Sequence, residues 1–168
     1  MKKIGIIIGS DSDLPIIEKA TALLDEFDAP YEVHVFSAHR TPEEAKAFAV
    51  NASDNGFGVI IAAAGMAAHL AGAIAANTIL PVIGIPCKSG ALEGIDALLS
   101  TVMMPTGIPV ATVAINGSAN AALLSLEILA LEDRELAKKL ADKRRADSEK
   151  VLEKDRLISE RFNKAGQA

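Results

Sequence analysis

Short apolar segments alternate with amphipathic segments from the start of the chain to about residue 132. Five runs have the length and pattern of buried β-strands, namely residues 4–8, 31–36, 59–63, 81–85 and 109–115. Apolar residues between these runs recur at helical spacing, as do Ile16, Ile17, Ala20, Leu23, Leu24 and Phe27. Strands and helices that alternate with short connections predict a parallel sheet covered by helices on both faces. We therefore expect an α/β protein with three layers.

A doubly wound parallel sheet of five strands favours the flavodoxin-like strand order 2-1-3-4-5. In this order the loops after the first, second and third strands converge near the switch point, where open sheets of this class bind ligands. Most of the polar residues that could carry chemistry lie in these three loops. The sequence therefore predicts a binding site at the carboxyl ends of these strands.

The composition changes after residue 132 to dense, mixed charge with few apolar positions. We expect one domain over residues 1–168, with a sheet-and-helix core at 1–132 and a C-terminal helical arm at 133–168. The predicted helices already cover the sheet, so this arm has no evident place on its own subunit. We favour an arm that packs on a neighbouring subunit. The alternative is a solvated terminal helix stabilised by ion pairs four residues apart.

Charge and composition exclude several classes of protein. The net charge of −5 and a pI near 5.2 argue against a nucleic-acid-binding protein, which needs a basic face. The chain has one cysteine, Cys87, so it forms no internal disulfide, as is typical of the reducing cytosol. No apolar run reaches the length of a membrane span. We expect a cytoplasmic protein that binds neither nucleic acid nor membrane.

The second predicted loop combines three kinds of chemistry within four residues. Ser37, His39 and Arg40 supply a hydroxyl, a titratable imidazole and a permanent cation directly before a predicted helix. Thr41 is the expected cap of that helix, with Pro42 at its first position and Glu44 closing a capping box. This combination beside a helix N-terminus suits a site that holds a phosphate and moves a proton. An ordinary polar loop is the alternative.

The first and third loops are also suited to a phosphorylated ligand. Gly9-Ser10-Asp11-Ser12-Asp13 offers hydroxyl donors at Ser10 and Ser12, and the Asp13 carboxylate can take both hydroxyls of a ribose. Capping of the following helix is the alternative role for these residues. The small residues of Gly65-Met66-Ala67-Ala68 leave room for a ligand and expose backbone N–H groups. We expect His69 to lie inside the helix that follows.

The remaining reactive side chains predict no metal centre and no covalent nucleophile. The three histidines lie on separate elements and have no cysteine or carboxylate partner at metal-ligand spacing. We assign no role to His34, which lies in the middle of a predicted strand. Cys87 has no recognisable base beside it in the sequence.

Four motifs in register resemble one known family. They are Gly9-Ser10-Asp11-Ser12-Asp13, Ser37-Ala38-His39-Arg40-Thr41-Pro42, Ala67-Ala68-His69-Leu70 and Met104-Pro105-Thr106-Gly107-Ile108-Pro109-Val110. The match runs from about Ile4 to about Leu152. It is to the N5-carboxyaminoimidazole ribonucleotide mutases, the bacterial class of the purine-pathway PurE family. The resemblance implies a flavodoxin-like fold, a homo-octamer, and neither a metal nor an organic cofactor.

The resemblance also implies roles for matching positions. Ser10, Ser12 and Asp13 stand where the family binds the ribotide, with Asp13 on the ribose hydroxyls. Ser37 and Arg40 stand at the phosphate. His39 matches the proton-transfer residue, and His69 matches a second histidine that orients rather than transfers. The residues that match the wall beside the moving carboxylate are Ala64, Gly65, Met66 and Ala67. The chain departs from the family pattern at Ala63, Met66 and Ala71, which replace two glycines and a proline.

The reaction that this resemblance implies is an intramolecular carboxyl transfer. It converts 5-carboxyamino-1-(5-phosphoribosyl)imidazole into 5-amino-1-(5-phosphoribosyl)imidazole-4-carboxylate in purine biosynthesis. Two alternatives stay open. One is an aminoimidazole ribonucleotide carboxylase that uses free carbon dioxide, but carboxylases of the animal type have a lysine where Arg40 stands. The other is a non-catalytic nucleotide-sensing module of the same fold, which leaves His39 without a role.

Overall fold

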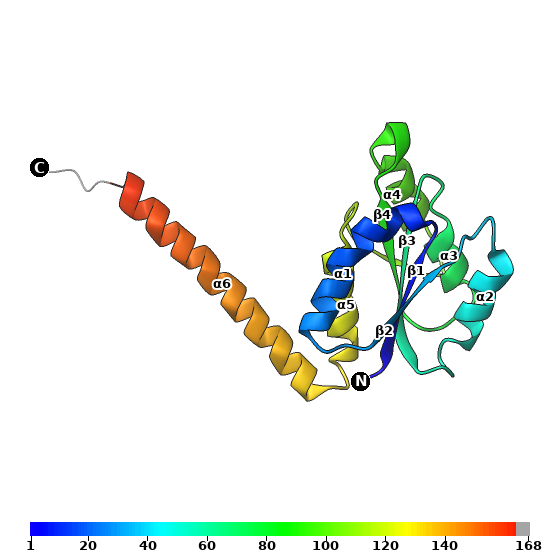
Figure 1. Ribbon diagram of the computed structural model, residues 1–168, viewed down its shortest axis with the longest axis horizontal. Helices are drawn as coiled ribbons and strands as arrows, with labels where there is room; N and C mark the ends of the chain where they lie inside the picture. Colours follow the sequence, from blue (N-terminus) through cyan, green and yellow to red (C-terminus); the bar gives the residue numbers. More distant parts are fainter. Residues whose placement is uncertain (164–168) are drawn as a thin grey trace, which may run out of the picture.

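The computed structural model describes residues 1–163 and contains a single five-stranded parallel sheet (Figure 1). Its strands are β1 (Lys3–Ile8), β2 (Tyr31–Val35), β3 (Phe57–Gly65), β4 (Val82–Cys87) and β5 (Ala111–Thr112). Their order is β2-β1-β3-β4-β5, and every neighbouring pair is parallel. The predicted doubly wound, flavodoxin-like order is confirmed. It places the carboxyl ends of β1, β2 and β3 side by side.

Helices cover both faces of the sheet. They are α1 (Leu14–Glu26), α2 (Pro42–Asn51), α3 (Leu70–Ala75), α4 (Ile95–Val102), α5 (Ser118–Leu129) and α6 (Arg134–Phe162). Helices α1 and α5 pack on one face, and α2, α3 and α4 cover the other, which gives the three predicted layers (Figure 1). The described residues contain no helix that is both long and apolar enough to cross a membrane.

Successive side chains of β1 point to opposite faces of the sheet, and the core accordingly has two parts. Ile4, Ile6 and Ile8 are buried in the cluster beneath α1 and α5. Ile7 points to the opposite face and joins the cluster beneath α2 and α3. Gly5 lies on that same face, where an added Cβ would approach the Phe48 ring to 2.8 Å. A strand buried on both faces therefore needs an almost wholly apolar sequence, with a small residue where a helix packs closely.

The edge strand β5 is shorter than predicted. The apolar run predicted a strand over 109–115, but only Ala111–Thr112 pair with β4. Pro109 has no N–H to donate to a ladder. At the other end, Asn116 adopts a left-handed φ of 56°. Residues 109–115 are only partly buried or exposed. Beyond Thr112 the N–H groups of Val113 and Asn116 still donate to the Gly84 and Pro86 carbonyls of β4, so the segment stays beside β4 without forming a regular ladder.

The first turns of α6 pack on their own domain, contrary to our expectation that this segment has no place there. Leu136 and Leu140 are buried in the cluster formed by α1, α5 and the sheet. The Asp133 side chain caps the helix by accepting a hydrogen bond from the Leu136 N–H at 3.0 Å. Lys139 pairs with Asp28 at 2.9 Å. The start of α6 is therefore part of the core.

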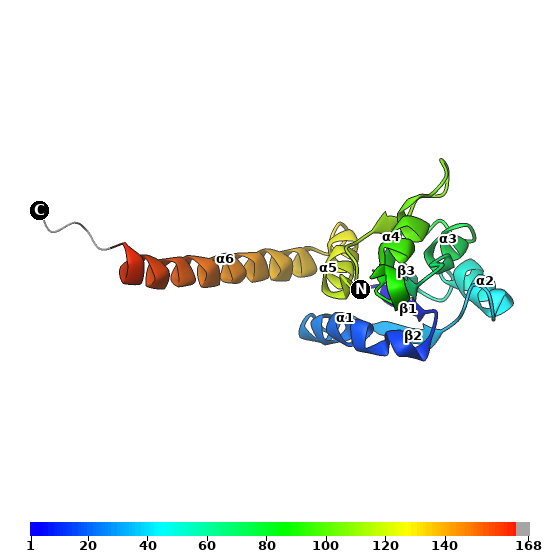
Figure 2. The ribbon, with the colours of Figure 1, turned by 90° about the horizontal axis from the view of Figure 1, so that it is seen from above.

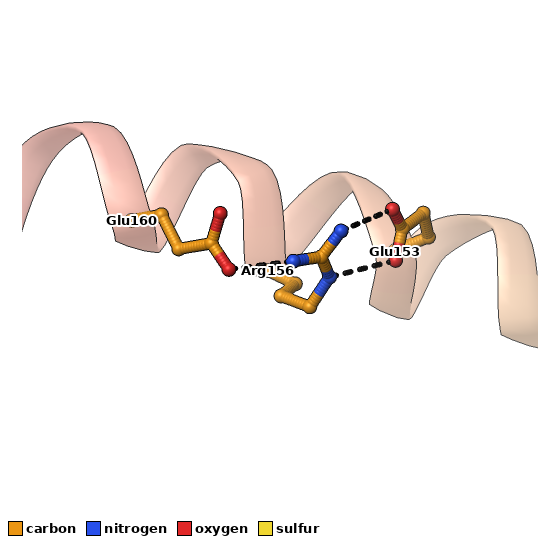
Figure 3. Close-up of polar contacts among 3 residues, drawn as sticks. All are labelled: Glu153, Arg156 and Glu160. Carbon is orange, nitrogen blue, oxygen red and sulfur yellow. Dashed lines mark hydrogen bonds and ion pairs between the residues drawn. The ribbon is translucent and has the colours of Figure 1, made fainter.

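Beyond these turns α6 extends away from the rest of the molecule (Figures 1 and 2). Arg156 forms ion pairs with Glu153 at 2.7 Å and with Glu160 at 2.6 Å on its surface (Figure 3). Such exposed pairs contribute little stability. The apolar residues of this part are more than half exposed: Val151, Leu152, Leu157, Ile158 and Phe162. This length of helix thus carries apolar side chains that its own domain does not bury.

Candidate active site

Loops at the carboxyl ends of β1, β2, β3 and β4 enclose a cavity of about 520 Å³. Its lining consists of Gly9, Ser10, Ser12, Asp13, Ser37, Ala38, His39, Arg40, Ala64, Gly65, Met66, Ala67, Leu70 and Ser89. The structure thus brings together the three loops that the sequence predicted to converge. Of the predicted catalytic and substrate-binding residues, His69 alone is absent from the lining, and it contacts His39.

Hydrogen bonds within the second loop hold it in place, but they differ from the predicted helix cap. Thr41 makes no side-chain cap to α2, so the predicted capping box is wrong. Instead its Oγ1 accepts a hydrogen bond from the Ser37 N–H at 2.8 Å. The Ser37 hydroxyl oxygen in turn accepts from the N–H groups of His39, at 3.3 Å, and Arg40, at 3.2 Å. Thr41 and Ser37 therefore brace the loop that presents the imidazole and the guanidinium.

Arg40 joins the first and second loops. Its Nη2 donates to the backbone carbonyl of Gly9 at 2.8 Å, while the side chain stays exposed at the cavity. An arginine has five N–H donors in a planar fork, so this contact leaves most of them for an anion. The cavity therefore has a fixed cation at the junction of two loops.

The imidazole of His39, in the cavity lining, contacts the imidazole of His69, which lies outside the lining. Nε2 of His39 lies 2.9 Å from Nδ1 of His69, and the rings meet edge to face with centroids 5.1 Å apart. One of these nitrogens must donate and the other accept, so the pair shares a proton. His69 is the N-cap residue of α3, at the start of the helix rather than inside it as we expected. This position lets it reach His39 across the loop.

Asp13 and Cys87 lie together beneath the first loop. Burial raises the pKa of the Asp13 carboxyl above its usual range, and the nearby Ser10 backbone and Cys87 thiol partly oppose that shift. Burial, with the nearby Asp13, raises the pKa of the Cys87 thiol to about 12. A thiol that stays protonated at neutral pH is a poor nucleophile. The expectation that Cys87 is not a nucleophile therefore agrees with its environment.

The third loop has an unusual backbone and a partner that sequence reasoning missed. Met66 adopts a left-handed φ of 54°, and its side chain is 64% exposed. The Ser89 hydroxyl oxygen accepts a hydrogen bond from the Met66 N–H at 3.0 Å. Ser89 follows β4, so it comes from the fourth loop, whereas the predicted site residues come from the loops after β1, β2 and β3. The one feature of the sequence that could have indicated a role for Ser89 is its hydroxyl just after the end of a predicted strand.

Other parts of the molecule offer less chemistry. Within residues 1–163, no group of three histidine, cysteine or carboxylate side chains could hold a metal ion. A larger hollow of about 980 Å³ lies elsewhere, between the end of α3 and the segment that leads into β5. No titratable side chain lines it, and Ile79 at its wall is fully exposed. The 520 Å³ cavity is therefore the candidate active site.

Comparison with known proteins shows the family to which the chain belongs. The sequence model of one family, described as AIR carboxylase, matches residues 3–150. The chain belongs to the AIR carboxylase family. The match spans all five strands and every residue that lines the cavity. The resemblance inferred from the four motifs is thereby confirmed.

Individual relatives of this AIR carboxylase family member carry two different activity names. The N5-carboxyaminoimidazole ribonucleotide mutase of Pyrococcus horikoshii is 54% identical over 157 residues, which cover 94% of this chain and 89% of that protein. The phosphoribosylaminoimidazole carboxylase of Saccharomyces cerevisiae is 52% identical over 151 residues, which cover 90% of this chain but only 26% of that protein. A crystal structure of Treponema denticola PurE superposes with a TM-score of 0.85 at 29% identity, covering 93% of this chain and 98% of that one.

Proposed function

We propose that this protein is an isomerase of purine biosynthesis, an N5-carboxyaminoimidazole ribonucleotide mutase. It moves a carboxyl group from the exocyclic nitrogen of the ribotide to ring carbon C4. The observation that carries the proposal is the His39–His69 pair at the edge of a cavity that also holds the Arg40 guanidinium, most of whose donors are unused. Near-full-length similarity to the Pyrococcus mutase supports the same activity.

The phosphate and ribose of the substrate bind at the first and second loops. Arg40 and the Ser37 hydroxyl hold the phosphate, because a guanidinium with several unused donors suits a doubly charged anion. Asp13 accepts hydrogen bonds from the ribose hydroxyls, and these bonds compensate for burial of its charge. Ser10 and Ser12 complete this side of the site. The imidazole ring of the substrate then lies toward His39 and the third loop.

His39 carries the proton in both halves of the reaction. As an imidazolium it protonates the exocyclic nitrogen while the C–N bond of the carbamate breaks and carbon dioxide leaves. The C4 carbon, made nucleophilic by the neighbouring amine, attacks the carbon dioxide and forms the C–C bond. Neutral His39 then removes the C4 proton, which restores both the aromatic ring and the imidazolium. His69 orients His39 through the 2.9 Å contact between their nitrogens.

The third loop keeps carbon dioxide beside C4 between these two steps. Its wall consists of Ala64, Gly65, Met66 and Ala67. The small side chains let the backbone approach the carboxylate closely. Capture of a confined molecule replaces an encounter with dissolved gas, a proximity effect worth roughly 7–11 kcal/mol at best.

A carbon-label experiment tests this function against both alternatives. Purified protein receives unlabelled carbamate ribotide in excess ¹³C-bicarbonate, and the reaction is stopped well before equilibrium. A mutase yields the C4 carboxylate with little label, whereas a carboxylase that uses free carbon dioxide yields product with the label content of the medium. A nucleotide-sensing module yields no product, although it binds the ribotide. Either of the last two results overturns the proposal.

The assembly and location of the protein belong to this proposal as well. We propose a cytoplasmic homo-octamer in which the exposed part of α6 packs on a neighbouring subunit. Spacing along the helix supports this placement. Val151, Ile158 and Phe162 follow Leu140 by 11, 18 and 22 residues, close to whole numbers of helical turns. They therefore extend the face that Leu140 already buries on its own domain. The proposed reaction needs neither a metal nor an organic cofactor, because the carbamate is already activated.

A further inference from the structure

The fourth loop contributes a polar group to the part of the cavity where the carboxyl group moves. Ser89 comes two residues after the end of β4 and precedes a short 3₁₀ turn, Gly90–Leu92. Its backbone is extended, with φ −154° and ψ 151°, and its hydroxyl does not cap that turn. Instead the side chain points across the sheet edge and lines the cavity beside the third loop. The hydroxyl is therefore directed to the third loop rather than to its own segment.

Two features of β3 make room for this hydroxyl. A Cβ added at Gly65 would lie 2.5 Å from the Ser89 Oγ, so only glycine lets the two segments approach this closely. The next residue, Met66, turns into a left-handed φ of 54° and donates its N–H to the Ser89 Oγ at 3.0 Å. An L-residue in this conformation carries strain, so it persists only where its surroundings hold it. The Ser89 hydroxyl is one of those constraints.

The proton of this hydroxyl remains available to a ligand. A serine hydroxyl can accept and donate at the same time. Its oxygen accepts from Met66, but within residues 1–163 the hydroxyl hydrogen has no acceptor. The neighbouring Ala67 N–H also has no hydrogen-bond partner in the described part of the chain. The cavity lining therefore has two unused donors, one on Ser89 and one on the residue that follows Met66.

We infer that Ser89 binds the migrating carboxyl group, donating its hydroxyl hydrogen to a carboxylate oxygen while its oxygen holds Met66 N–H in place. This inference rests on the proposed mutase function. The Ser89 hydroxyl thus binds the carboxylate on the third-loop side of the cavity, both before and after the carboxyl transfer. This hydrogen bond should raise the affinity of the site for ribotides that carry the carboxyl group relative to the ribotide without it.

Equilibrium binding of two ribotides tests the inference. The probes are 5-amino-1-(5-phosphoribosyl)imidazole-4-carboxylate and the same ribotide without the carboxylate. Ser89→Ala should weaken binding of the carboxylated ribotide about 10-fold or more, the effect of losing a hydrogen bond to a charged group. Its affinity for the decarboxylated ribotide should stay within about twofold, because the phosphate and ribose contacts are unchanged. Ser89→Thr, which keeps the hydroxyl, should restore most of the lost affinity.

A matched control and a second readout separate this role from a structural one. Ser100→Ala removes a helix hydroxyl that donates to the Asp96 carbonyl at 2.8 Å, away from the cavity, and should change neither affinity. Ser89→Ala should also raise the share of ¹³C from the medium in the product, because the freed carbon dioxide is held less firmly. If Ser89→Ala weakens both ribotides equally, or neither, Ser89 does not bind the carboxylate. If the unaltered protein fails to convert the carbamate ribotide at all, the proposed function itself is wrong.

Discussion

The Nε2 of His39 lies 2.9 Å from the Nδ1 of His69, although the two residues are 30 positions apart in the chain. His39 follows β2, and His69 precedes α3 after β3. These strands are not neighbours in the sheet, since β1 lies between them. The pair therefore exists only because the loops at one edge fold over the end of β1. It is the arrangement on which the proposed proton transfer depends.

Replacing His39 by Asn should remove most turnover and leave ribotide binding nearly intact. The amide is polar and close to the ring in size, but it neither gains nor loses a proton near neutral pH, and general acid–base groups contribute roughly 10²–10⁴-fold to rate. Steady-state kinetics together with ribotide binding check this prediction. His34→Asn is the matched control, because His34 stacks on Phe36 outside the cavity. Near-normal turnover of the His39 variant would exclude His39 as the proton carrier.

Arg40→Lys should weaken ribotide binding by about 10- to 100-fold, because a lysine cannot both donate to Gly9 and form a bidentate contact with phosphate. Calorimetric measurement of the dissociation constant checks the change. Arg145→Lys serves as control, since Arg145 pairs with Asp142 on the surface of α6. An unchanged dissociation constant in the Arg40 variant removes this residue from the phosphate site.

Asp13→Asn should stabilise the ligand-free protein at neutral pH and flatten the pH dependence of its unfolding. Burial raises the pKa of Asp13 in the folded state, so the folded protein binds a proton more tightly than the unfolded chain does. Between the ordinary pKa near 3.8 and the raised one, stability therefore falls as pH rises, and at neutral pH the charged form destabilises the fold. Urea unfolding from pH 4 to pH 7 measures this slope in both proteins. A steeper slope in the variant would contradict the prediction.

The exposed face of α6 can be tested without disturbing the core. Truncation after Arg145 keeps Leu136 and Leu140 and should release subunits from the assembly, which light scattering detects. Val151→Asp with Ile158→Asp should have the same effect, since burying two carboxylates in an apolar contact is costly. Ala146→Asp adds a carboxylate on a different face of the helix and should leave the assembly intact. An unchanged mass for the double variant would contradict the proposed packing of the arm.

Met66→Gly should leave stability unchanged or raise it by up to about 1 kcal/mol. The left-handed φ of 54° strains an L-residue but not glycine, and this gain offsets the greater freedom of glycine in the unfolded chain. Met103→Gly is the matched control, because Met103 is also exposed but has an ordinary φ of −82°. It should lose roughly 0.5–1 kcal/mol. Urea unfolding at one protein concentration compares the two, and an equal loss in both would contradict the argument.

Much of the fold could be predicted from sequence because burial leaves a local pattern. The wholly apolar runs of β1 and β3 predicted central strands, and the alternation of strands with helices predicted the sheet order. The ends of strands and the hydrogen bonds at the starts of helices were harder to predict. The edge strand β5 has only two residues, because an apolar run shows that a segment favours a sheet and not how far its regular pairing with β4 continues. Thr41 is the N-cap residue of α2 and Pro42 opens the helix, as predicted, but the Thr41 hydroxyl bonds to Ser37 instead of capping the helix.

The sequence by itself determined the strand order, the three loops at one sheet edge and the presence there of hydroxyls, an imidazole and a cation. These features follow from local periodicity and from residue types at strand ends. Only the tertiary structure decided that His69 contacts His39, that Arg40 bonds to Gly9, and that Ser89 holds the third loop. Each of these contacts joins residues that lie 23 to 31 positions apart. These contacts depend on how the loops pack against one another. The sequence pattern of a single segment does not indicate which residues of another segment lie within contact distance.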